Sequence, residues 1–223
     1  MKIVAIDGPA GSGKGTIAKL VAEACGLVNI DTGATYRAVT LKALKENIDL
    51  TNKDELTKIS SNIDIHFTPN GLVYLDKIDV TKEIRSEEVT KNVSIVSSVI
   101  GVRENMVKFQ KLLASNYNCI MEGRDITTVV FPNAEFKFYL DASSEERARR
   151  RFIQNKEIGI NIPLDELKKS IEKRDYADMH KEVGSLTRTD SQIYIDTTKM
   201  TIDEVANEII SIVKGEKKNE LKR

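Results

Sequence analysis

A short apolar run near the start of the chain leads directly into a glycine-rich loop that ends in lysine, glycine and threonine. Residues 3–7 read Ile-Val-Ala-Ile-Asp, and residues 8–16 read Gly-Pro-Ala-Gly-Ser-Gly-Lys-Gly-Thr. Backbone N–H groups can close around phosphate oxygens only where no Cβ intervenes, so such a loop needs glycine. We therefore expect a strand over residues 3–7, a helix over residues 16–24, and a bound phosphate at the positive end of that helix.

The loop departs at one position from the usual phosphate-binding pattern G-x-x-x-x-G-K-[ST]. Gly15 stands where a hydroxyl is usual, and Thr16 comes one residue later. Because that hydroxyl commonly contacts Mg²⁺, we expect the Mg²⁺ of bound ATP to be held mainly through water and phosphate oxygens, and no protein ligand is assigned to it. The alternative, a turn that only links a strand to a helix, is disfavoured by the lysine. The candidate ATP-binding residues are Gly8, Pro9, Ala10, Gly11, Ser12, Gly13, Lys14, Gly15 and Thr16.

The charge balance of the chain gives no sign of a polyanionic partner. The 223 residues include 34 Lys+Arg and 34 Asp+Glu, so nothing in the net charge favours nucleic acid or an anionic membrane. Two cysteines, Cys25 and Cys119, are too few for a disulfide framework and indicate a reducing compartment. The first strand begins near Lys2, which leaves no room for a signal peptide. We expect a cytoplasmic monomer that binds neither nucleic acid nor membrane.

Apolar patterning predicts strands and helices that alternate over most of the chain. Residues 118–122 and 136–140 are continuous apolar runs bounded by polar residues, as in parallel strands that are covered on both faces. A last strand is expected over residues 193–196, and expected helices cover residues 34–46, 53–60, 86–97, 99–114, 164–178 and 201–213, with another beginning at residue 143. This order predicts a three-layer α/β/α fold with a parallel central sheet and ligands at the carboxyl ends of its strands.

One β-rich stretch interrupts the alternation. Residues 63–67, 72–75 and 78–80 have strand-like patterns, and Pro69-Asn70-Gly71 is a turn signal. We interpret residues 62–82 as part of an inserted subdomain on the side of a second substrate. The expected division of this single domain is a core at about 1–33, 115–150 and 185–213, a substrate subdomain at about 34–114, a lid at about 150–165 and a charged tail at 214–223.

Arginines matter more than bases for phosphoryl transfer, because negative charge spreads over the transferred group. Arg37, Arg103, Arg124 and Arg174 each lie in a segment that we expect at a strand end or facing the cleft. For any one of them the alternative is a solvated surface arginine. Arg124 is the strongest candidate because it follows the apolar run 118–122, where an active site of this architecture collects its groups.

A second group of arginines lies on one expected helix: Arg147, Arg149, Arg150 and Arg151. Their spacing spreads them around the helix, so only some of them can face a ligand. One interpretation is a charged, solvated helix face. The other, favoured by the flexible-looking segment 154–162, is a lid that closes over the phosphates of ATP and excludes water.

The motifs of this chain resemble those of the cytidylate kinase family of nucleoside monophosphate kinases. The resemblance spans nearly the whole chain and is carried by Ile6-Asp7-Gly8-Pro9 with the loop after it, residues 31–37, Glu83-Ile84-Arg85, Val102-Arg103-Glu104, Gly123-Arg124-Asp125, residues 128–132, residues 140–147 and Arg174-Asp175. It implies a P-loop kinase fold with a β-containing monophosphate-binding insert and a short lid. It also implies Mg²⁺-dependent transfer of the γ-phosphate of ATP to CMP or dCMP.

The same resemblance implies a set of CMP-binding residues: Thr32, Arg37, Ser94, Arg103, Arg124, Asp125, Arg174, Asp178 and Lys181. Ser94, Arg103 and Asp125 would bind the cytosine, because a carboxylate suits its amino group and the other two suit its acceptor atoms. Uracil would leave buried polar groups mispaired. By the same resemblance, the sugar would be bound by Arg174 and Asp178. The acceptor phosphate would be bound by Arg37, Arg124 and Lys181. For Asp125 the simpler alternative is an ion pair with Arg124, and for Ser94 it is a surface hydroxyl.

The resemblance further implies four catalytic residues, which are Lys14, Arg124, Arg147 and Arg151, and an ATP contact from Arg150. Three positions depart from the family pattern. Lys181 stands where arginine is usual, Thr127 where glycine is usual, and Gly184-Ser185 where a proline usually precedes leucine. Lysine keeps the charge but lacks the bidentate fork of arginine, so a weaker hold on the acceptor phosphate is expected.

Two other functions share part of this pattern. A GTPase-like switch would need an N-K-x-D sequence, which residues 52–55 approach but miss at Glu55. Another P-loop nucleoside monophosphate or small-metabolite kinase is the nearer alternative. The β-rich insert and residues 123–125 favour a cytidylate kinase over both.

Overall fold

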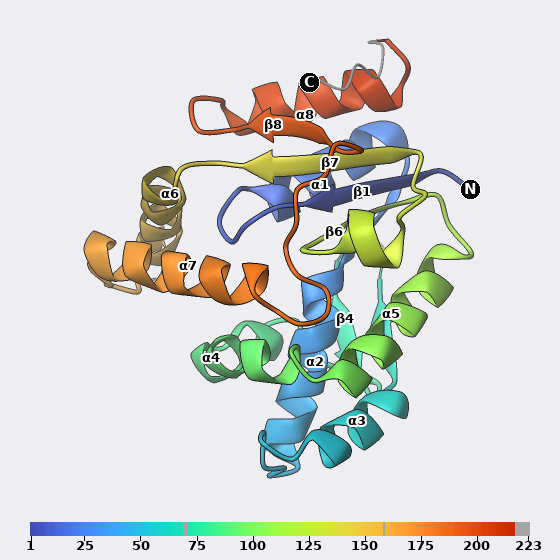
Figure 1. Ribbon diagram of the computed structural model, residues 1–223, viewed down its shortest axis with the longest axis vertical. Helices are drawn as coiled ribbons and strands as arrows, with labels where there is room; N and C mark the ends of the chain where they lie inside the picture. The colour runs from blue at the N-terminus through green and yellow to red at the C-terminus, as the bar shows by residue number, and fades with distance from the viewer. Residues whose placement is uncertain (69–70, 158, 217–223) are drawn as a thin grey trace.

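The computed structural model describes residues 1–68, 71–157 and 159–216 and shows two lobes stacked along the longest axis (Figure 1). The upper lobe holds the strands β1 (Ile3–Asp7), β2 (Val28–Asp31), β6 (Cys119–Gly123), β7 (Phe136–Asp141) and β8 (Ile193–Asp196). They form one sheet in the order β2-β6-β1-β7-β8, and each neighbouring pair is parallel. The described helices are α1 (Lys14–Cys25), α2 (Thr32–Lys45), α3 (Lys53–Ser61), α4 (Glu87–Val96), α5 (Ile100–Ala114), α6 (Ser144–Glu157), α7 (Leu164–Met179) and α8 (Ile202–Val213).

Alternate residues of the strands face opposite sides of this sheet, so both of its faces are apolar. On one face, Val4 and Ile6 of β1 belong to a buried cluster with residues of α1 and α8. On the other face, Ala5 belongs to a cluster with residues of α5 and of a π-helical turn, η2 (Ile126–Val130). The sheet is covered on both faces, and the predicted three-layer α/β/α fold with a parallel central sheet is confirmed.

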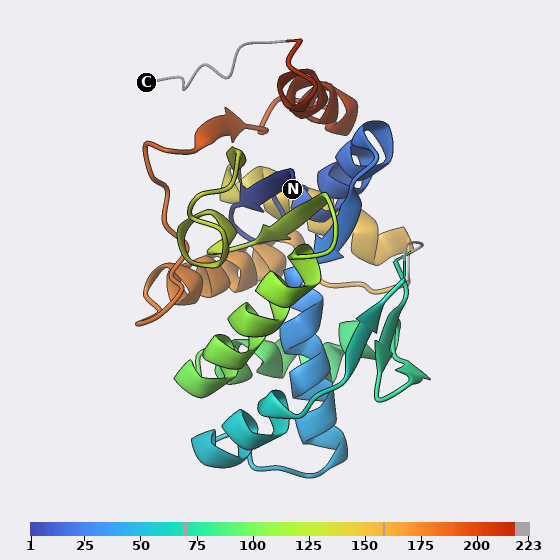
Figure 2. The same ribbon diagram turned by 90° about the vertical axis from the view of Figure 1, so that its right-hand side faces the viewer.

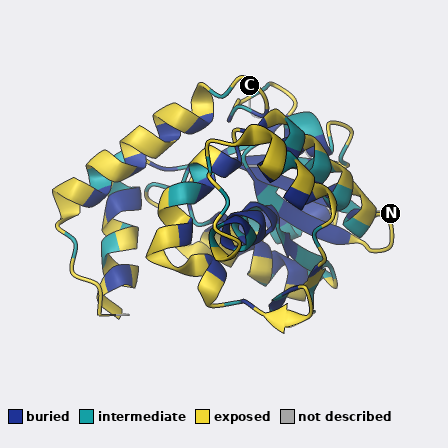
Figure 3. Cartoon of the chain, turned by 90° about the horizontal axis from the view of Figure 1, so that it is seen from below, coloured by how far each residue is buried: buried dark blue, intermediate teal, exposed yellow. Residues whose placement is uncertain are grey.

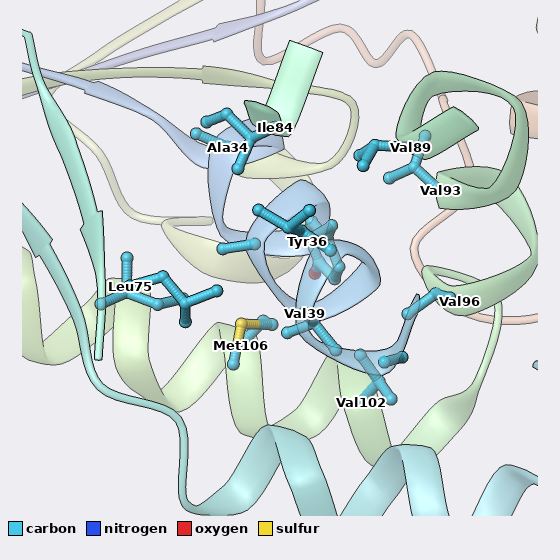
Figure 4. Close-up of a cluster of buried hydrophobic side chains, with 14 of the residues drawn as sticks. Ala34, Tyr36, Val39, Leu75, Ile84, Val89, Val93, Val96, Val102 and Met106 are labelled. Carbon is cyan, nitrogen blue, oxygen red and sulfur yellow. The ribbon is translucent and has the colours of Figure 1, made fainter. Parts of the chain in front are cut away.

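The lower lobe has a hydrophobic core of its own, with α2 running through its middle (Figure 2). Tyr36 of α2, Val93 of α4 and Met106 of α5 meet there (Figure 4). A three-stranded antiparallel sheet closes one side and consists of β3 (Ile65–Phe67), β4 (Val73–Leu75) and β5 (Ile78–Asp79).

This small sheet is the β-rich insert that the sequence predicts. Ile65 pairs with Leu75, and both are buried, whereas His66 and Tyr74 form the next pair and face the other side. The first strand begins two residues later than expected, at Ile65. Of the expected turn at residues 69–71, residues 69 and 70 lie outside the described part of the chain.

Helices α6 and α7 lie together at the left of the upper lobe in Figure 1. Ala148, Leu167 and Ile171 form a small buried cluster between them. The expectation of a flexible segment from residue 154 is wrong in its first part, because α6 continues to Glu157. Beyond the helix, the N–H of Ile160 donates to the carbonyl oxygen of the buried Asn155 at 2.8 Å, so Ile160 is bonded to the last turn of α6.

Local capping explains where two functional helices begin. Gly13 has a left-handed backbone, with φ +88°, and its carbonyl accepts the N–H of Ile17 at 3.0 Å. Helix α1 therefore begins at Lys14, two residues earlier than expected. Helix α2 has the expected cap, because Asp31 accepts the N–H of Ala34 at 3.0 Å.

Seen from below, the exposed residues of the outer helices lie on the sides that face away from the molecule, and the buried residues lie on the sides that face inward (Figure 3). Within the described ranges, no helix combines the length and the apolar character needed to cross a membrane. Both cysteines are free thiols; Cys119 is buried and Cys25 is partly buried. Of the expected charged tail, residues 217–223 lie outside the described part of the chain.

Candidate active site

The glycine-rich loop joins β1 to α1 at the carboxyl end of the central strand of the sheet. Gly8 has φ +152°, and a Cβ on it would lie 2.0 Å from the carbonyl oxygen of Leu140 in β7, so no side chain fits there. The loop therefore packs directly on the end of a neighbouring strand. Its backbone N–H groups and the first turn of α1 lie at one end of the helix, where an anion is favoured.

Lys14 is the first residue of α1, and it is only 4% exposed. Its Nζ donates to the carbonyl oxygen of Pro9 at 2.7 Å and to Oγ of Ser12 at 3.3 Å. Burial, followed by the nearby charge of Arg124, lowers the pKa of Lys14 to about 7. A phosphate chain beside Lys14 would offset this cost and favour the charged ammonium group.

On the acceptor side, the carboxylate of Asp178 in α7 joins three cations. It accepts Nε of Arg124 at 2.8 Å, lies 2.9 Å from Nζ of Lys181 and lies 4.0 Å from Nε of Arg174. Burial alone would raise the pKa of Asp178, but the charges of Arg124 and Lys181 outweigh it and hold the pKa at about 2. Four residues that the resemblance places at the acceptor therefore lie together.

A second buried ion pair joins Arg103 of α5 to Asp125, which follows β6. Arg103 also donates to the carbonyl oxygen of Ser97 at 3.3 Å. Burial raises the pKa of Asp125, and the charge of Arg103 opposes this rise. The alternative of an ion pair between Asp125 and its neighbour Arg124 is not what forms, because Arg124 binds Asp178 instead.

Three further predicted CMP-binding residues lie on α2 and α4. Oγ1 of Thr32 donates to the carbonyl oxygen of Glu122 at 2.7 Å, which ties the start of α2 to the end of β6. Arg37 donates to the carboxylate of Asp31 at 2.6 Å. Ser94 is half-buried on α4, so it is not a fully exposed surface hydroxyl.

The arginines of α6 divide as their spacing predicts, with only some of them facing the loop. Arg147 is buried and donates to the carbonyl oxygen of Ala10, in the loop, at 2.9 Å. Arg150 is half-buried and donates to the carbonyl oxygen of Thr197 at 2.6 Å. The exposed members are Arg149 and Arg151.

The cations around the loop and the acceptor cluster repel one another. Loss of hydration beside the neighbouring elements, and then the charge of Arg124, lowers the pKa of Arg174, although its side chain is 42% exposed, and Arg37 and Arg151 add to this effect. Arg124 and Arg174 likewise contribute to the lowered pKa of Lys14. Phosphate groups bound between these side chains would relieve the repulsion, so the electrostatics connect the loop with the acceptor cluster.

Comparison with known proteins decides the family. Residues 4–215 match the family model described as cytidylate kinase. A cytidylate kinase of Desulforamulus reducens is 49% identical over 214 residues, which cover 95% of this chain and 96% of that protein. One from Leuconostoc mesenteroides is 45% identical over 215 residues, with 95% and 96% covered. This chain belongs to the cytidylate kinase family.

Membership in the cytidylate kinase family makes the protein a nucleoside monophosphate kinase with a P-loop, as the sequence motifs predict. A solved structure of an uncharacterized protein from Eubacterium ventriosum superposes with a TM-score of 0.52 at 12% identity, covering 96% of this chain and 99% of that one. That likeness shows a shared fold and carries no information about the substrate.

This cytidylate kinase family member uses Thr127 to connect three parts of the chain. Oγ1 of Thr127 donates to Asp7 at 2.5 Å and accepts Nε2 of Gln192 at 2.5 Å. The carboxylate of Asp7 also accepts the N–H groups of Ile126 and Thr127, at 2.8 and 2.9 Å. The hydroxyl at this position therefore helps to hold the turn after Asp125 against the end of β1.

Gly184 is the second unusual position of this family member. Its φ is +69°, and a Cβ would lie 1.8 Å from Nη2 of Arg103 and 2.4 Å from Oδ2 of Asp125. The segment after α7 therefore packs its backbone directly on the buried Arg103–Asp125 pair. Any other residue at this φ would be strained, and its Cβ would push the ion pair aside.

Sequence reasoning gave no role to three carboxylates that lie at the site, which are Asp7, Glu122 and Asp175. Asp7 and Glu122 come at the carboxyl ends of β1 and β6, with Asp7 beside Gly123 and Glu122 beside Ile6. Their position at neighbouring strand ends was a usable signal. Asp175 belongs to the Arg174-Asp175 motif, but nothing in the sequence indicated a contact with the loop, because it is one acid among many charged residues of α7.

Proposed function

We propose that this protein transfers the γ-phosphoryl group of ATP to CMP and dCMP, giving CDP and dCDP. The observation that carries the proposal is the ionic cluster around Asp178, which lies within electrostatic reach of the phosphate-loop lysine. A loop for a triphosphate and a cluster for a monophosphate, close enough for their charges to interact, suit phosphoryl transfer between two nucleotides.

On the donor side, the loop from Gly8 to Thr16 holds the phosphates of ATP with its N–H groups, and Lys14 contacts the β- and γ-phosphates. Arg147, Arg150 and Arg151 come from α6, which packs on the loop. Arg147 and Arg151, with Lys14 and Arg124, stabilise the charge that develops on the transferred group. Arg150 contacts ATP from the half-buried side of the helix.

On the acceptor side, Arg37, Arg124 and Lys181 hold the phosphate of CMP. An oxygen of that phosphate attacks the γ-phosphorus in line, the new O–P bond forms, and the bond to the β–γ bridging oxygen breaks so that ADP leaves. No general base is needed, because the attacking phosphate is already ionised at neutral pH.

The remaining acceptor residues hold the nucleoside. Arg174 and Asp178 contact the sugar, and Thr32 contributes from the start of α2. Ser94 and the buried Arg103–Asp125 pair bind the cytosine. Asp125 accepts from the exocyclic amino group of cytosine. Uracil has a carbonyl at that position, so it would place an acceptor against the carboxylate where cytosine supplies a donor.

Mg²⁺ enters this site with ATP, and the residues present fit it. Within the described residues, no three His, Cys, Asp or Glu side chains are placed to hold a metal by themselves. The carboxylate of Glu122 does lie beside the loop, because a Cβ on Gly15 would be 3.4 Å from its Oε1. Burial, and then the charge of Asp31, raises the pKa of Glu122, so a nearby cation would be favoured. Oxygen atoms of Glu122, water and the phosphates suit Mg²⁺, which would neutralise phosphate charge.

The domain division is part of the same proposal. The monophosphate-binding subdomain covers about 34–114, and the core covers about 1–33, 115–150 and 185–213. The lid, at about 150–165, comprises the end of α6 and the connection to α7. We place the protein in the cytoplasm as a monomer.

An ADP-release assay with purified protein, Mg²⁺ and ATP tests this function across CMP, dCMP, UMP, AMP and shikimate. The expected result is rapid turnover with CMP and dCMP and much slower turnover with UMP and AMP. Equal activity on AMP and CMP would overturn the assignment of the cytosine-binding residues. Turnover of shikimate alone would overturn the nucleotide acceptor altogether.

A further inference from the structure

One residue of the phosphate loop, Ala10, has both of its backbone polar groups held by a single buried ion pair. Its carbonyl oxygen accepts Nη1 of Arg147 at 2.9 Å. Its N–H donates to Oδ1 of Asp175 at 3.3 Å. Arg147 and Asp175 are themselves joined, with Nη1 2.5 Å from Oδ2. Their side chains are only 7% and 9% exposed, so solvent screens this pair little.

The ion pair connects three elements that are far apart in the sequence. Ala10 precedes α1, Arg147 lies in the first turn of α6, and Asp175 lies near the end of α7. Nε of Arg147 also donates to the carbonyl oxygen of Ala142 at 2.8 Å, which holds the guanidinium on a second side. Rotation of this guanidinium would break several contacts together.

The third guanidinium nitrogen of Arg147, Nη2, is placed differently from the other two. Nε is used by Ala142, and Nη1 is shared by Ala10 and Asp175. Within the described residues, Nη2 has no hydrogen-bond partner, and it is not among the fully buried polar atoms that lack one. An arginine whose other donors are fixed by protein therefore keeps one N–H₂ group for an anion beside the loop.

We propose that Asp175 is a positioning residue for ATP, acting through Arg147 and through the N–H of Ala10. The inference rests on the proposed function, because it assumes that the loop binds the phosphates of ATP. The carboxylate of Asp175 orients the guanidinium so that Nη2 stays available, and it fixes the loop backbone at Ala10. Its neighbours in α7, Arg174 and Asp178, serve the acceptor instead.

The test is to replace Asp175 and measure each substrate separately. Asp175→Asn keeps an acceptor for the N–H of Ala10 but removes the charge that orients Arg147. The expected result is a rise in KM for ATP and a loss in kcat that together lower kcat/KM for ATP about 10-fold to 100-fold. KM for CMP should change little, and Asp175→Glu, which keeps the charge, should recover part of the loss. The exposed Asp165, on the same helix, supplies the matched control Asp165→Asn.

A double-mutant cycle then asks whether Asp175 acts through Arg147. Once Arg147→Ala is in place, adding Asp175→Asn should cause little further loss. Losses that simply multiply, or a rise in KM for CMP with KM for ATP unchanged, would overturn the inference. If Asp175→Asn fails to fold in thermal unfolding, Asp175→Ser, which also removes the charge, takes its place, and an unchanged KM for ATP in that variant overturns the inference.

Calorimetric titration with ADP and Mg²⁺ separates this inference from the proposed function. ADP affinity needs no acceptor nucleotide, so it reports on the loop even if CMP is not the acceptor. Weaker ADP binding by Asp175→Asn, with Asp165→Asn unaffected, supports the positioning role. Unchanged ADP affinity together with unchanged KM for ATP refutes it.

Discussion

The donor and acceptor sides of this active site are built in opposite ways. The phosphate loop of the donor side is one continuous stretch, residues 8–16, which runs from the end of a strand into the first turn of the next helix, and the arginines of α6 join it from later in the chain. The acceptor side is collected from separate segments, with Arg103 on α5, Arg124 and Asp125 after β6, and Asp178 on α7. The phosphate loop depends mainly on its own backbone conformation. The acceptor side depends on ion pairs that hold elements from distant parts of the sequence next to one another.

The two sides also differ in how their charges are balanced before substrate binds. Among the described residues, the hydrogen-bond partners of Lys14 are neutral oxygens of the loop, and its pKa is lowered to about 7 by burial and by Arg124. Asp178 and Asp125 pair with arginines that come from other segments. Loss of Lys14 should therefore reduce catalysis with little cost in stability, whereas loss of one of these acceptor residues should affect both.

Lys14→Ala should produce the largest effect and the cleanest contrast. We expect a loss of at least about 10³-fold in kcat, or about 4 kcal/mol of transition-state stabilisation, because the lysine acts where charge develops. The thermal unfolding temperature should not fall, since a buried ammonium with a lowered pKa does not favour the folded state. The ADP-release assay and a thermal melt measure the two. Lys19→Ala, an exposed lysine on the same helix, is the control and should retain full activity.

Asp125→Asn should weaken the acceptor side selectively. We expect KM for CMP to rise about 10-fold to 100-fold, from the loss of about 1–3 kcal/mol at a buried charged contact, with KM for ATP nearly unchanged. Discrimination between CMP and UMP should fall as well. Initial rates at varied CMP and varied ATP measure this, with Asp190→Asn at an exposed carboxylate as the control. An equal rise in both KM values would mean that Asp125 supports the fold rather than the cytosine.

The ion pairs of Asp178 on the acceptor side should make the stability of the protein depend on pH. The folded-state pKa of Asp178 is about 2, against an ordinary value of 3.8, which corresponds to about 2 kcal/mol of stabilisation. That contribution is complete above the ordinary pKa and is lost as pH falls through the folded-state pKa. Urea unfolding between pH 6 and pH 2 should show Asp178→Asn to be less stable at pH 6 by an amount that shrinks toward pH 2. A constant difference across this range would argue against the ion pairs as its source.

Lys181→Arg should give the smallest effect, and in the favourable direction. A guanidinium can contact a phosphate in a bidentate way, so KM for CMP should fall about 2-fold to 5-fold. Steady-state kinetics at saturating ATP measure this change. Lys173→Arg, at an exposed position of α7, is the matched control. A higher KM for CMP would show that the ion pair between Lys181 and Asp178, at 2.9 Å, needs the compact ammonium group.

Much of the fold follows from local patterns that the structure confirms. Apolar runs predicted β6 and β7, and the interruption around residues 62–82 predicted the separate small sheet. The predictions fail where a single contact moves a boundary. Helix α1 begins early because the carbonyl of Gly13 accepts the N–H of Ile17, and α6 extends to Glu157, into the segment expected to be flexible.

The sequence did not predict which charged side chains of the site pair with each other. Arg124 and Asp125 are neighbours in sequence and looked like partners for each other. Each binds a residue more than 20 positions away, Asp178 and Arg103 respectively, because successive side chains after a strand point in different directions. No spacing rule would have found Asp175 against Ala10 either, since a contact between residues 165 positions apart depends on how α7 packs on the loop.

By itself, the sequence determined the phosphate loop of the donor side. Three glycines and a lysine in a fixed order specify a backbone conformation, and backbone conformation depends on the residues that adopt it. Tertiary structure alone decided the acceptor side, where Asp178 brings Arg124, Arg174 and Lys181 together. The physical reason is that a buried charge is stable only beside an opposite one, and in this site the partners come from elements that meet only when the sheet, α5 and α7 have packed.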